Sequence, residues 1–412
     1  MKIIVSSLYF YTDHSGIALY ATDFAKYAQE EGHDVKVITG FPFYPNWKKR
    51  KEDRRRFFRI DNLGSIKIYR GYTYVPPKPS TLSRLIQEFF MLFFSIINYL
   101  RVGKHDLIVV FSTPVSFGFL GVVMKWLYRS KLIINVQDFQ VEAASSLKMV
   151  KGSFFVDLLK KIEGFSYKHA DFVSTISRSM INVLKEKHVP QEKILFWPNW
   201  INLNEIDSLK IENGTFRKRY DVCDEDIIIG YAGNIGLKQG LEVMVDLANE
   251  FLETPCLRFY IIGEGAGLEG LKDYYQKTQP KNITFLPFLK TIEYKEFLVD
   301  SDVIFVSQKK TNKDIYFPSK LLEIMAMSKT ILLNADKDSE LYKVLKDNNL
   351  AYVTDYKDLS ALKEATKTLI NQPGLKATFG ENARSFVTQY DRKNILGKII
   401  NQINNEKTNS NR

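Results

Sequence analysis

The stretch GYAGNIGLKQG occupies residues 230–240, directly after the apolar run of residues 227–229 and directly before a helix-like pattern. This order places small residues and one lysine, Lys238, at a turn from a strand into a helix. Backbone N–H groups and the positive end of a helix can hold a phosphate at such a turn. The stretch therefore predicts a phosphate-binding loop within an α/β domain.

Apolar runs alternate with helical periods in both halves of the chain, the pattern of a doubly wound α/β sheet. Because the 412 residues exceed what one core supports, roughly 250–300 residues, we expect two Rossmann-like domains facing each other across a cleft. The expected strands are residues 3–8, 35–39, 66–69, 107–111, 132–136 and 172–176, then 227–231, 257–262, 283–286, 303–306 and 330–333.

A break in both periodicities falls at residues 196–204, FWPNWINLN, where Pro198 and three asparagines stand. We expect a hinge there, with one domain over residues 1–200 and a second over residues 201–385. Residues 386–412 are expected to form a C-terminal helix and polar tail that return to the first domain.

Composition limits the class of protein. With 45% hydrophobic and 25% charged residues, the chain is typical of a folded globular protein. Two cysteines, Cys223 and Cys256, cannot form a disulfide framework and favour a cytoplasmic location. The five histidines are scattered without ligand spacing, so no metal site is predicted.

Two apolar segments raise the question of targeting or membrane insertion. The N-terminal MKIIVSSLYFY lacks a small-residue cleavage pattern and predicts a first strand. Residues 107–124 carry no charge and reach the lower limit of a membrane span. Pro114 divides them into a strand and a helix, which favours a buried strand–turn–helix unit.

The net charge of +11 is concentrated in residues 48–59, KKRKEDRRRFFR, which carry eight basic and two acidic residues, a net charge of +6. An apolar, aromatic stretch follows at residues 85–100. Basic clusters beside such segments suit an anionic bilayer surface; a solvated loop before an ordinary core helix is the alternative. The predicted membrane-surface residues are Arg54, Arg55, Arg56, Phe57 and Phe58. No nucleic-acid motif accompanies the charge, and no nucleic-acid partner is expected.

Lys238 is the strongest candidate for a catalytic residue. Its flexible ammonium can reach a diphosphate that the backbone of Gly236 approaches closely. A fixed cation there would stabilise the charge that grows on a departing diphosphate. Asn234 could donate to the same phosphates, or could serve as a local turn residue.

A second constellation stands in YFPSKLLEIMAM, after the fourth expected strand of the second domain. Pro318 at a helix start, followed by Ser319 and Lys320, presents free N–H groups to an anion. Glu323 follows one turn later, where its carboxylate could accept both hydroxyls of a ribose or could instead be an exposed helix residue. The carboxyl edge of an open sheet is where ligands bind.

These stretches, together with residues 9–39 and FWPNWINL, resemble glycosyltransferase family 4 from Met1 to about Tyr390. The likeness is to members that assemble bacterial capsule, O-antigen and colanic-acid-type polysaccharides. It implies the GT-B fold and metal-independent, retaining transfer of a sugar without a cofactor. The donor would be a nucleotide-diphosphate sugar, with uridine favoured, bound by the second domain. The acceptor, bound by the first domain, is expected to be a polyprenyl-diphosphate-linked saccharide, because the basic and aromatic segments of that domain could bring the enzyme to the inner face of the plasma membrane.

The resemblance also assigns roles to residues. Gly16 matches a family glycine that lets the backbone approach the donor. Lys238 matches the family's phosphate-binding lysine. Glu323 matches the second acid of a two-glutamate motif, the acid that holds the ribose. Asn234 stands where an arginine is often found. Ile315, beside Asp314, stands where the first acid is expected.

Other matches concern the acceptor and the base. Asp138 resembles an acidic residue near the acceptor, where it could orient or deprotonate the attacking hydroxyl, although it could also cap the next helix. Glu142 is a weaker candidate in the same turn. Glu264 lies in a family turn, and Phe288 lies where relatives hold the base.

Two alternative functions stay open at this point. A nicotinamide-dependent oxidoreductase is suggested by GEGAG at residues 263–267, although the spacing is not the full dinucleotide fingerprint. A catalytically inactive sugar-nucleotide-binding protein would be compatible with the missing first glutamate.

Overall fold

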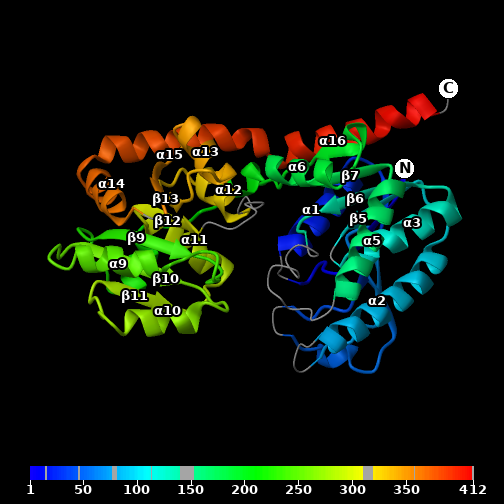
Figure 1. The fold of residues 1–412 in the computed structure, drawn as a ribbon, viewed down its shortest axis with the longest axis horizontal. Coiled ribbons are helices and arrows are strands. Elements are labelled where there is room, and N and C mark those ends of the chain that lie inside the picture. The colour runs from blue at the N-terminus through cyan, green and yellow to red at the C-terminus, as the bar shows by residue number, and fades with distance from the viewer. Residues whose placement is uncertain are drawn as a thin grey trace. The chain divides into compact units, whose positions relative to one another are not determined.

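The computed structural model describes residues 1–13, 16–44, 47–76, 81–112, 114–139, 153–309, 319–356 and 358–410. It divides into two compact units, drawn in Figure 1. The first comprises Met1–Asn199 and Leu396–Arg412, and the second Trp200–Ile395. The chain thus passes from the first unit to the second within residues 196–204, where Pro198 interrupts the periodicity.

The first unit holds, in its described part, an eight-stranded sheet in the order β3-β4-β2-β1-β5-β6-β7-β8. The pairs are parallel apart from β3 with β4. The strands are β1 (Lys2–Ser7), β2 (Asp34–Gly40), β3 (Phe58–Leu63), β4 (Ile66–Gly71), β5 (Leu107–Phe111), β6 (Lys131–Val136), β7 (Phe172–Thr175) and β8 (Ile194–Phe196). Every residue of β5 is buried, which explains its uninterrupted apolar sequence.

Helices cover this sheet, and α2, α3 and α5 lie side by side against it (Figure 1). The helices are α1 (Gly16–Glu30), η1 (Lys51–Asp53), α2 (Thr81–Val102), α3 (Ser116–Tyr128), α5 (Ser153–His169), α6 (Arg178–Glu186) and η2 (Gln191–Lys193). The C-terminal α16 (Arg392–Ser410) belongs to this unit from Leu396 onward, where Ile399 and Ile403 are buried.

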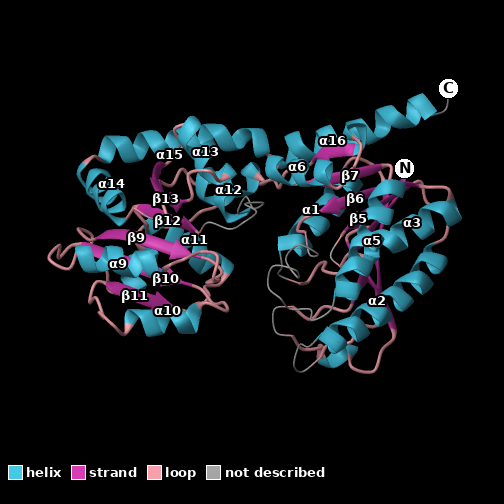
Figure 2. Ribbon diagram, in the orientation of Figure 1, coloured by secondary structure: helices cyan, strands magenta, loops and turns pink. Residues whose placement is uncertain are grey.

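The second unit holds a six-stranded parallel sheet in the order β11-β10-β9-β12-β13-β14, with helices around it (Figure 2). Its strands are β9 (Ile227–Ala232), β10 (Leu257–Ile262), β11 (Ile283–Leu286), β12 (Val303–Gln308), β13 (Ile331–Ala335) and β14 (Tyr352–Asp355). Its helices are α7 (Leu203–Asp207), α8 (Thr215–Arg219), α9 (Glu242–Glu250), α10 (Leu268–Tyr275), α11 (Thr291–Asp300), α12 (Ser319–Ala326), α13 (Glu340–Asp347), α14 (Leu359–Asn371), α15 (Pro373–Val387) and η3 (Thr388–Tyr390).

The second sheet separates two apolar cores, and neighbouring strand residues enter opposite ones. In β10, Phe259 and Ile261 pack into the core of α9, α10 and α14, whereas Tyr260 and Ile262 pack into the core of α11, α12 and α13. The alternation follows from the period of two along a strand. Both faces are therefore buried, as in a doubly wound sheet.

The prediction of two Rossmann-like α/β domains is confirmed, and each of the expected strands is present. The strand–turn–helix interpretation of residues 107–124 is also confirmed, by β5 and α3. Sequence patterns missed β3, β8 and β14. In β3, the antiparallel partner of β4 at the edge of the sheet, FRIDNL carries charges that resemble a loop.

Gly230 tests the packing of the second sheet. A Cβ at this position of β9 would overlap the ring of the buried Phe297 on α11. We expect Gly230→Ala to destabilise the protein by about 1–3 kcal/mol, the usual effect of overpacking, in urea unfolding. Gly270→Ala is the control, because open space surrounds Gly270 on α10 and alanine should stabilise a helix by roughly 0.5–1 kcal/mol. Equal stability of Gly230→Ala and the wild type would contradict this packing.

Candidate functional site

Two loops at the carboxyl edge of the second sheet are joined by their backbones. They follow β9 and β10, and comprise residues 233–240 and 263–267. The N–H of Gly233 donates to the carbonyl of Ile262 at 2.9 Å, and the N–H of Ile235 donates to the carbonyl of Glu264 at 2.8 Å. The N–H of Gly267 donates back to Ile235 at 2.8 Å. The two loops therefore form one fixed edge.

Glycines permit this close approach. Gly263 has a φ of 141°, and a Cβ there would overlap the carbonyl oxygen of Gly233. Gly265 has a φ of 156°, and a Cβ there would overlap the carbonyl oxygen of Ile235. The glycines of GEGAG are thus explained by contact with the neighbouring loop, which removes the basis for reading them as a dinucleotide fingerprint.

Lys238 lies on the exposed part of residues 233–240, the predicted phosphate loop. Its carbonyl accepts a 2.7 Å hydrogen bond from the N–H of Lys309, which follows β12. The strand order reverses between β9 and β12, and open sheets bind ligands outside the strand ends at such a switch point. Within the described part of the chain, the ammonium of Lys238 has neither an ion pair nor a hydrogen bond, so it can turn toward a ligand.

Lys309 anchors the loop from the other side. Its ammonium lies 3.2 Å from the carboxylate of Glu242, at the start of α9. Burial acts to lower the pKa of Lys309, but the hydrogen bond to Glu242 and the nearby Tyr356 outweigh it, and the pKa is raised. This ion pair could not be predicted from the sequence, because the two residues are 67 positions apart.

The remaining predicted residues of the two loops differ in exposure. Asn234 is exposed, and its carbonyl accepts a 2.7 Å hydrogen bond from the hydroxyl of Tyr231. Gly236 is half-buried beside the amide of Asn234. Glu264 is exposed, and its backbone carbonyl accepts the hydrogen bond from the N–H of Ile235. The loop backbone is thus fixed, whereas the side chains of Asn234 and Glu264 face water.

The start of α12 brings Lys320 together with Phe288, two residues predicted from separate motifs. Ser319 and Lys320 are half-buried in the first turn of the helix. The ammonium of Lys320 lies 5.6 Å from the ring centroid of Phe288 and 5.2 Å from that of Tyr294. Phe288 is 65% exposed, so its ring can accept another flat partner. Burial lowers the pKa of Lys320, and the neighbouring Glu323 opposes this shift.

Glu323 is half-buried on the same helix. Burial raises the pKa of its carboxyl, although the cations Lys295 and Lys320 act in the opposite direction. Tyr294 adds a phenol whose hydroxyl is buried and has no hydrogen-bond partner among the residues that the structure describes. Burial raises the pKa of this phenol well above the ordinary value. Carboxylates in such surroundings are concentrated at functional sites. Sequence reasoning missed Lys295 and Tyr294, because TIEYKEF resembles an ordinary amphipathic helix.

Gly16 and Asp138, two predicted site residues of the first unit, follow the carboxyl ends of β1 and β6. Gly16 is the first residue of α1, and the space where its Cβ would stand is open. Asp138 is exposed two residues after β6, next to the buried Phe139. Glu142, Asp314, Ile315 and Pro318 lie outside the described residues.

The basic run contains both exposed and packed residues. Arg54, Arg55 and Arg56 are exposed, and Phe57 is 63% exposed. Phe58 is instead half-buried as the first residue of β3, with its ring 5.1 Å from that of Phe94.

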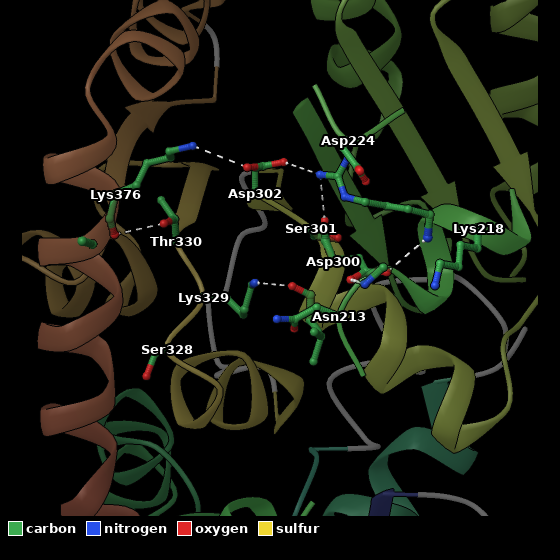
Figure 3. A pocket seen from close by; sticks show the side chains of 14 residues that line it. Asn213, Lys218, Asp224, Asp300, Ser301, Asp302, Ser328, Lys329, Thr330 and Lys376 are labelled. Atoms are coloured by element: carbon green, nitrogen blue, oxygen red, sulfur yellow. Dashed lines mark hydrogen bonds and ion pairs between the residues drawn. The ribbon is translucent and has the colours of Figure 1, made fainter. Parts of the chain in front are cut away.

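A polar hollow of about 690 Å³ lies elsewhere in the second unit (Figure 3). Asp302, which precedes β12 at the amino end of the strands, accepts ion pairs from Arg217 at 3.1 Å and Lys376 at 3.5 Å. Burial lowers the pKa of Lys329 to about 8, and its ammonium donates to the carbonyl of Val299 at 2.9 Å. These charges hold helix ends and strands together, and no predicted site residue lines the hollow.

Among the residues the structure describes, no group of three or more His, Cys, Asp or Glu side chains could hold a metal ion.

Comparison with known families extends over both units. The family model of Glycosyltransferase Family 4 matches residues 14–205, and that of Glycosyl transferases group 1 matches residues 213–386. The chain belongs to glycosyltransferase family 4. This family-4 enzyme is 29% identical to WcaI of Escherichia coli (strain K12), over 98% of this chain and 100% of WcaI. The name of WcaI describes it as a glycosyl transferase of colanic acid biosynthesis.

Solved structures show the same GT-B fold. Sucrose-phosphate synthase from Thermosynechococcus elongatus superposes with a TM-score of 0.72 at 15% identity, covering 100% of both chains. HepE from Anabaena, solved in complex with UDP-glucose, superposes with a TM-score of 0.70 at 14% identity, covering 98% of this chain and 100% of HepE. The fold predicted from the resemblance is therefore confirmed.

Glu323 gives the candidate site a pH signature. Because burial raises its pKa, the ionised carboxylate destabilises the folded chain above that pKa, and the effect disappears as the pH falls toward the ordinary value of about 4. We expect Glu323→Gln to be more stable than the wild type at about pH 8, with a difference that narrows on acidification. Urea unfolding of both proteins between about pH 4 and pH 8 measures this difference in the free energy of unfolding.

The matched control is Glu364→Gln. Glu364 is fully exposed, and its hydrogen bond to Lys367 lowers its pKa. Replacing Glu364 should therefore change the free energy of unfolding only slightly, and in the direction of lower stability. A destabilised Glu323→Gln variant at high pH would show that the carboxylate is needed for folding.

Proposed function

We propose that this family-4 glycosyltransferase moves a sugar from a nucleotide-diphosphate donor to the hydroxyl of a saccharide acceptor, with retention of anomeric configuration, in bacterial surface polysaccharide biosynthesis. The observation that carries the proposal is the phosphate loop, whose backbone is fixed between two neighbouring loops while Lys238 extends from it exposed. The name of WcaI supports the polysaccharide pathway, and the UDP-glucose held by HepE supports a uridine donor.

The donor's diphosphate would lie against the loop around Gly236. Negative charge grows on the diphosphate as the glycosidic bond breaks, and a cation positioned there lowers the barrier without a metal. Lys238 would supply that cation, and Asn234 a hydrogen-bond donor. The departing phosphate oxygen would accept the proton of the attacking hydroxyl, on the same face of the sugar, which gives retention.

The nucleoside would lie beside α12. The carboxylate of Glu323 accepts hydrogen bonds and could hold both ribose hydroxyls, and Ser319 stands in the first turn of the same helix. The exposed ring of Phe288 offers a stacking partner for the base, with Lys320 beside it. These groups belong to the second unit, which we assign to the donor.

The first unit would hold the acceptor, a polyprenyl-diphosphate-linked saccharide. Gly16 leaves room for a ligand at the start of α1, and the exposed carboxylate of Asp138 could orient the attacking hydroxyl. An acceptor anchored in lipid places a cytoplasmic enzyme on the inner face of the plasma membrane. The exposed residues Arg54, Arg55, Arg56 and Phe57 suit an anionic bilayer surface there.

A catalytically inactive sugar-nucleotide-binding protein is the second candidate, because Ile315 stands where the family's first acid is expected. Both candidates bind a nucleoside diphosphate, so binding alone does not separate them. Acceptor-dependent release of UDP from UDP-sugar does, since only the enzyme produces it.

Lys238→Ala tests the enzyme. We expect kcat/KM to fall about 10²- to 10³-fold, the usual loss when one preorganised stabilising group is removed from a transition state, in an assay of UDP release. The control is Lys281→Ala, an exposed lysine that precedes β11 at the opposite end of the strands and should keep full activity. NMR of the product's anomeric proton tests retention. If Lys238→Ala folds normally and releases UDP as fast as the wild type, the role given to this residue is refuted.

A further inference from the structure

One helix of the first unit carries an uncovered apolar face. Within the described residues, Ser83–Val102 of α2 is long and apolar enough to cross a membrane by length and composition, yet only 39% of that window is buried. Phe89 is 63% exposed, Phe93 49% and Leu100 57%, with Leu85 and Ile96 also exposed between 37% and 38%. Their spacing of three or four residues places them on one side of the helix.

The opposite side of α2 is fixed to the protein and cannot leave it. Met91, Phe94 and Tyr99 are buried against the sheet, where α2 packs on β2 and β4. The amide of Asn98 donates to the carbonyl of Tyr69 at 3.3 Å, and Glu88 accepts a 3.1 Å hydrogen bond from Ser116 of α3. A helix with one side tied to a sheet by polar contacts cannot span a bilayer, but it can lie along its surface.

The neighbouring helix α3 continues the apolar surface. Trp126 is 54% exposed and Leu127 57%, and Phe119 and Val123 are exposed on the same side. The Trp126 ring contacts Phe165 of α5, with centroids 5.9 Å apart. Figure 1 shows α2 and α3 side by side in the first unit. Tryptophan and phenylalanine are the residues that anchor helices lying at the bilayer interface.

Exposed basic residues lie near both ends of α2. Arg84 is exposed near the start of α2, and Arg101 and Lys104 are exposed at its end. The basic run of residues 48–56 joins the surface through Lys49, whose ammonium lies 3.5 Å from the centroid of the Tyr72 ring, and Tyr72 contacts Phe90 of α2. Apolar residues bordered by cations fit a leaflet with anionic headgroups, because the stems of Lys and Arg reach up to the phosphates.

A second copy of the chain fits less well. In a two-fold pairing the surface would meet itself, so each basic border would face an identical basic border and be repelled. We infer that the exposed faces of α2 and α3 form a docking surface that lies in the plane of an anionic bilayer. This inference rests on the proposed function, since a lipid-linked acceptor is what would require the enzyme at a membrane.

Vesicle flotation of the full chain tests the inference. The wild type should float with vesicles rich in phosphatidylglycerol, far less with phosphatidylcholine vesicles, and less at high salt. The double variant Phe89→Glu with Phe93→Glu should reduce binding by at least about tenfold, since each change removes an apolar anchor and adds a repelled charge. Leu252→Glu is the matched control, because Leu252 is 46% exposed after α9 in the second unit.

A second measurement locates α3 in the bilayer. In a Trp47→Phe background, Trp126 is the exposed tryptophan, since Trp197 and Trp200 are 0% and 4% exposed. Its emission should shift to the blue on binding and be quenched most strongly by lipids brominated near the headgroup. An unshifted spectrum with bound vesicles would exclude α3 from the docking surface.

UDP binding, measured on the same proteins, separates this inference from the proposed function. All variants should bind UDP like the wild type, because none touches the donor loops. Absence of flotation in a wild type that binds UDP would overturn the docking surface alone. Flotation in a wild type that does not bind UDP would overturn the proposed donor and leave the docking surface standing. If the wild type forms a dimer and does not bind vesicles, and the double variant is a monomer, the surface is a contact with a second copy and the inference is overturned.

Discussion

The site depends on two loops whose backbones approach closely enough to hydrogen-bond across the ends of β9 and β10. Ile235 donates to Glu264, and Gly267 donates back to Ile235. The approach is possible because Gly263 and Gly265 adopt conformations, and leave space, that a side chain would remove. Phosphate-binding groups act best when they are fixed before the ligand arrives. The glycines thus allow the contact that fixes the loop carrying Lys238, which stands six residues after the end of β9.

Charge in the second unit is arranged differently at its two ends. At the amino ends of the strands, Asp302 is paired with Arg217 and Lys376, so the charges neutralise one another and stabilise the fold. At the carboxyl ends, Lys238 is exposed and Glu323 is a half-buried carboxylate that its surroundings disfavour. A carboxylate whose ionised form is penalised by burial is a candidate for a functional group rather than for a stabilising one. The contrast favours the carboxyl edge as the place of chemistry.

The first unit uses one helix for two environments. α2 fills the core with Met91 and Tyr99 and exposes Phe89 and Phe93 on its other side. Ordinary surface helices expose polar residues instead. If the proposed lipid-linked acceptor is the substrate, such a helix would keep the enzyme close to a substrate confined to two dimensions.

The two α/β domains and most strands could be predicted from the sequence alone, because buried parallel strands have continuous apolar runs such as LIVVF in β5. The sequence also predicted the loop between β9 and α9, whose small residues and lysine indicate a phosphate-binding turn, and that phosphate-binding role stays a prediction. It did not determine β3, whose charged edge position resembles a loop, or the anchor of Lys309 on Glu242. Only the tertiary structure brought Phe288, Tyr294 and Lys320 together and set Lys295 beside Glu323. These contacts join separate turns and helices, and local periodicity carries no information about which distant side chains share one end of a sheet.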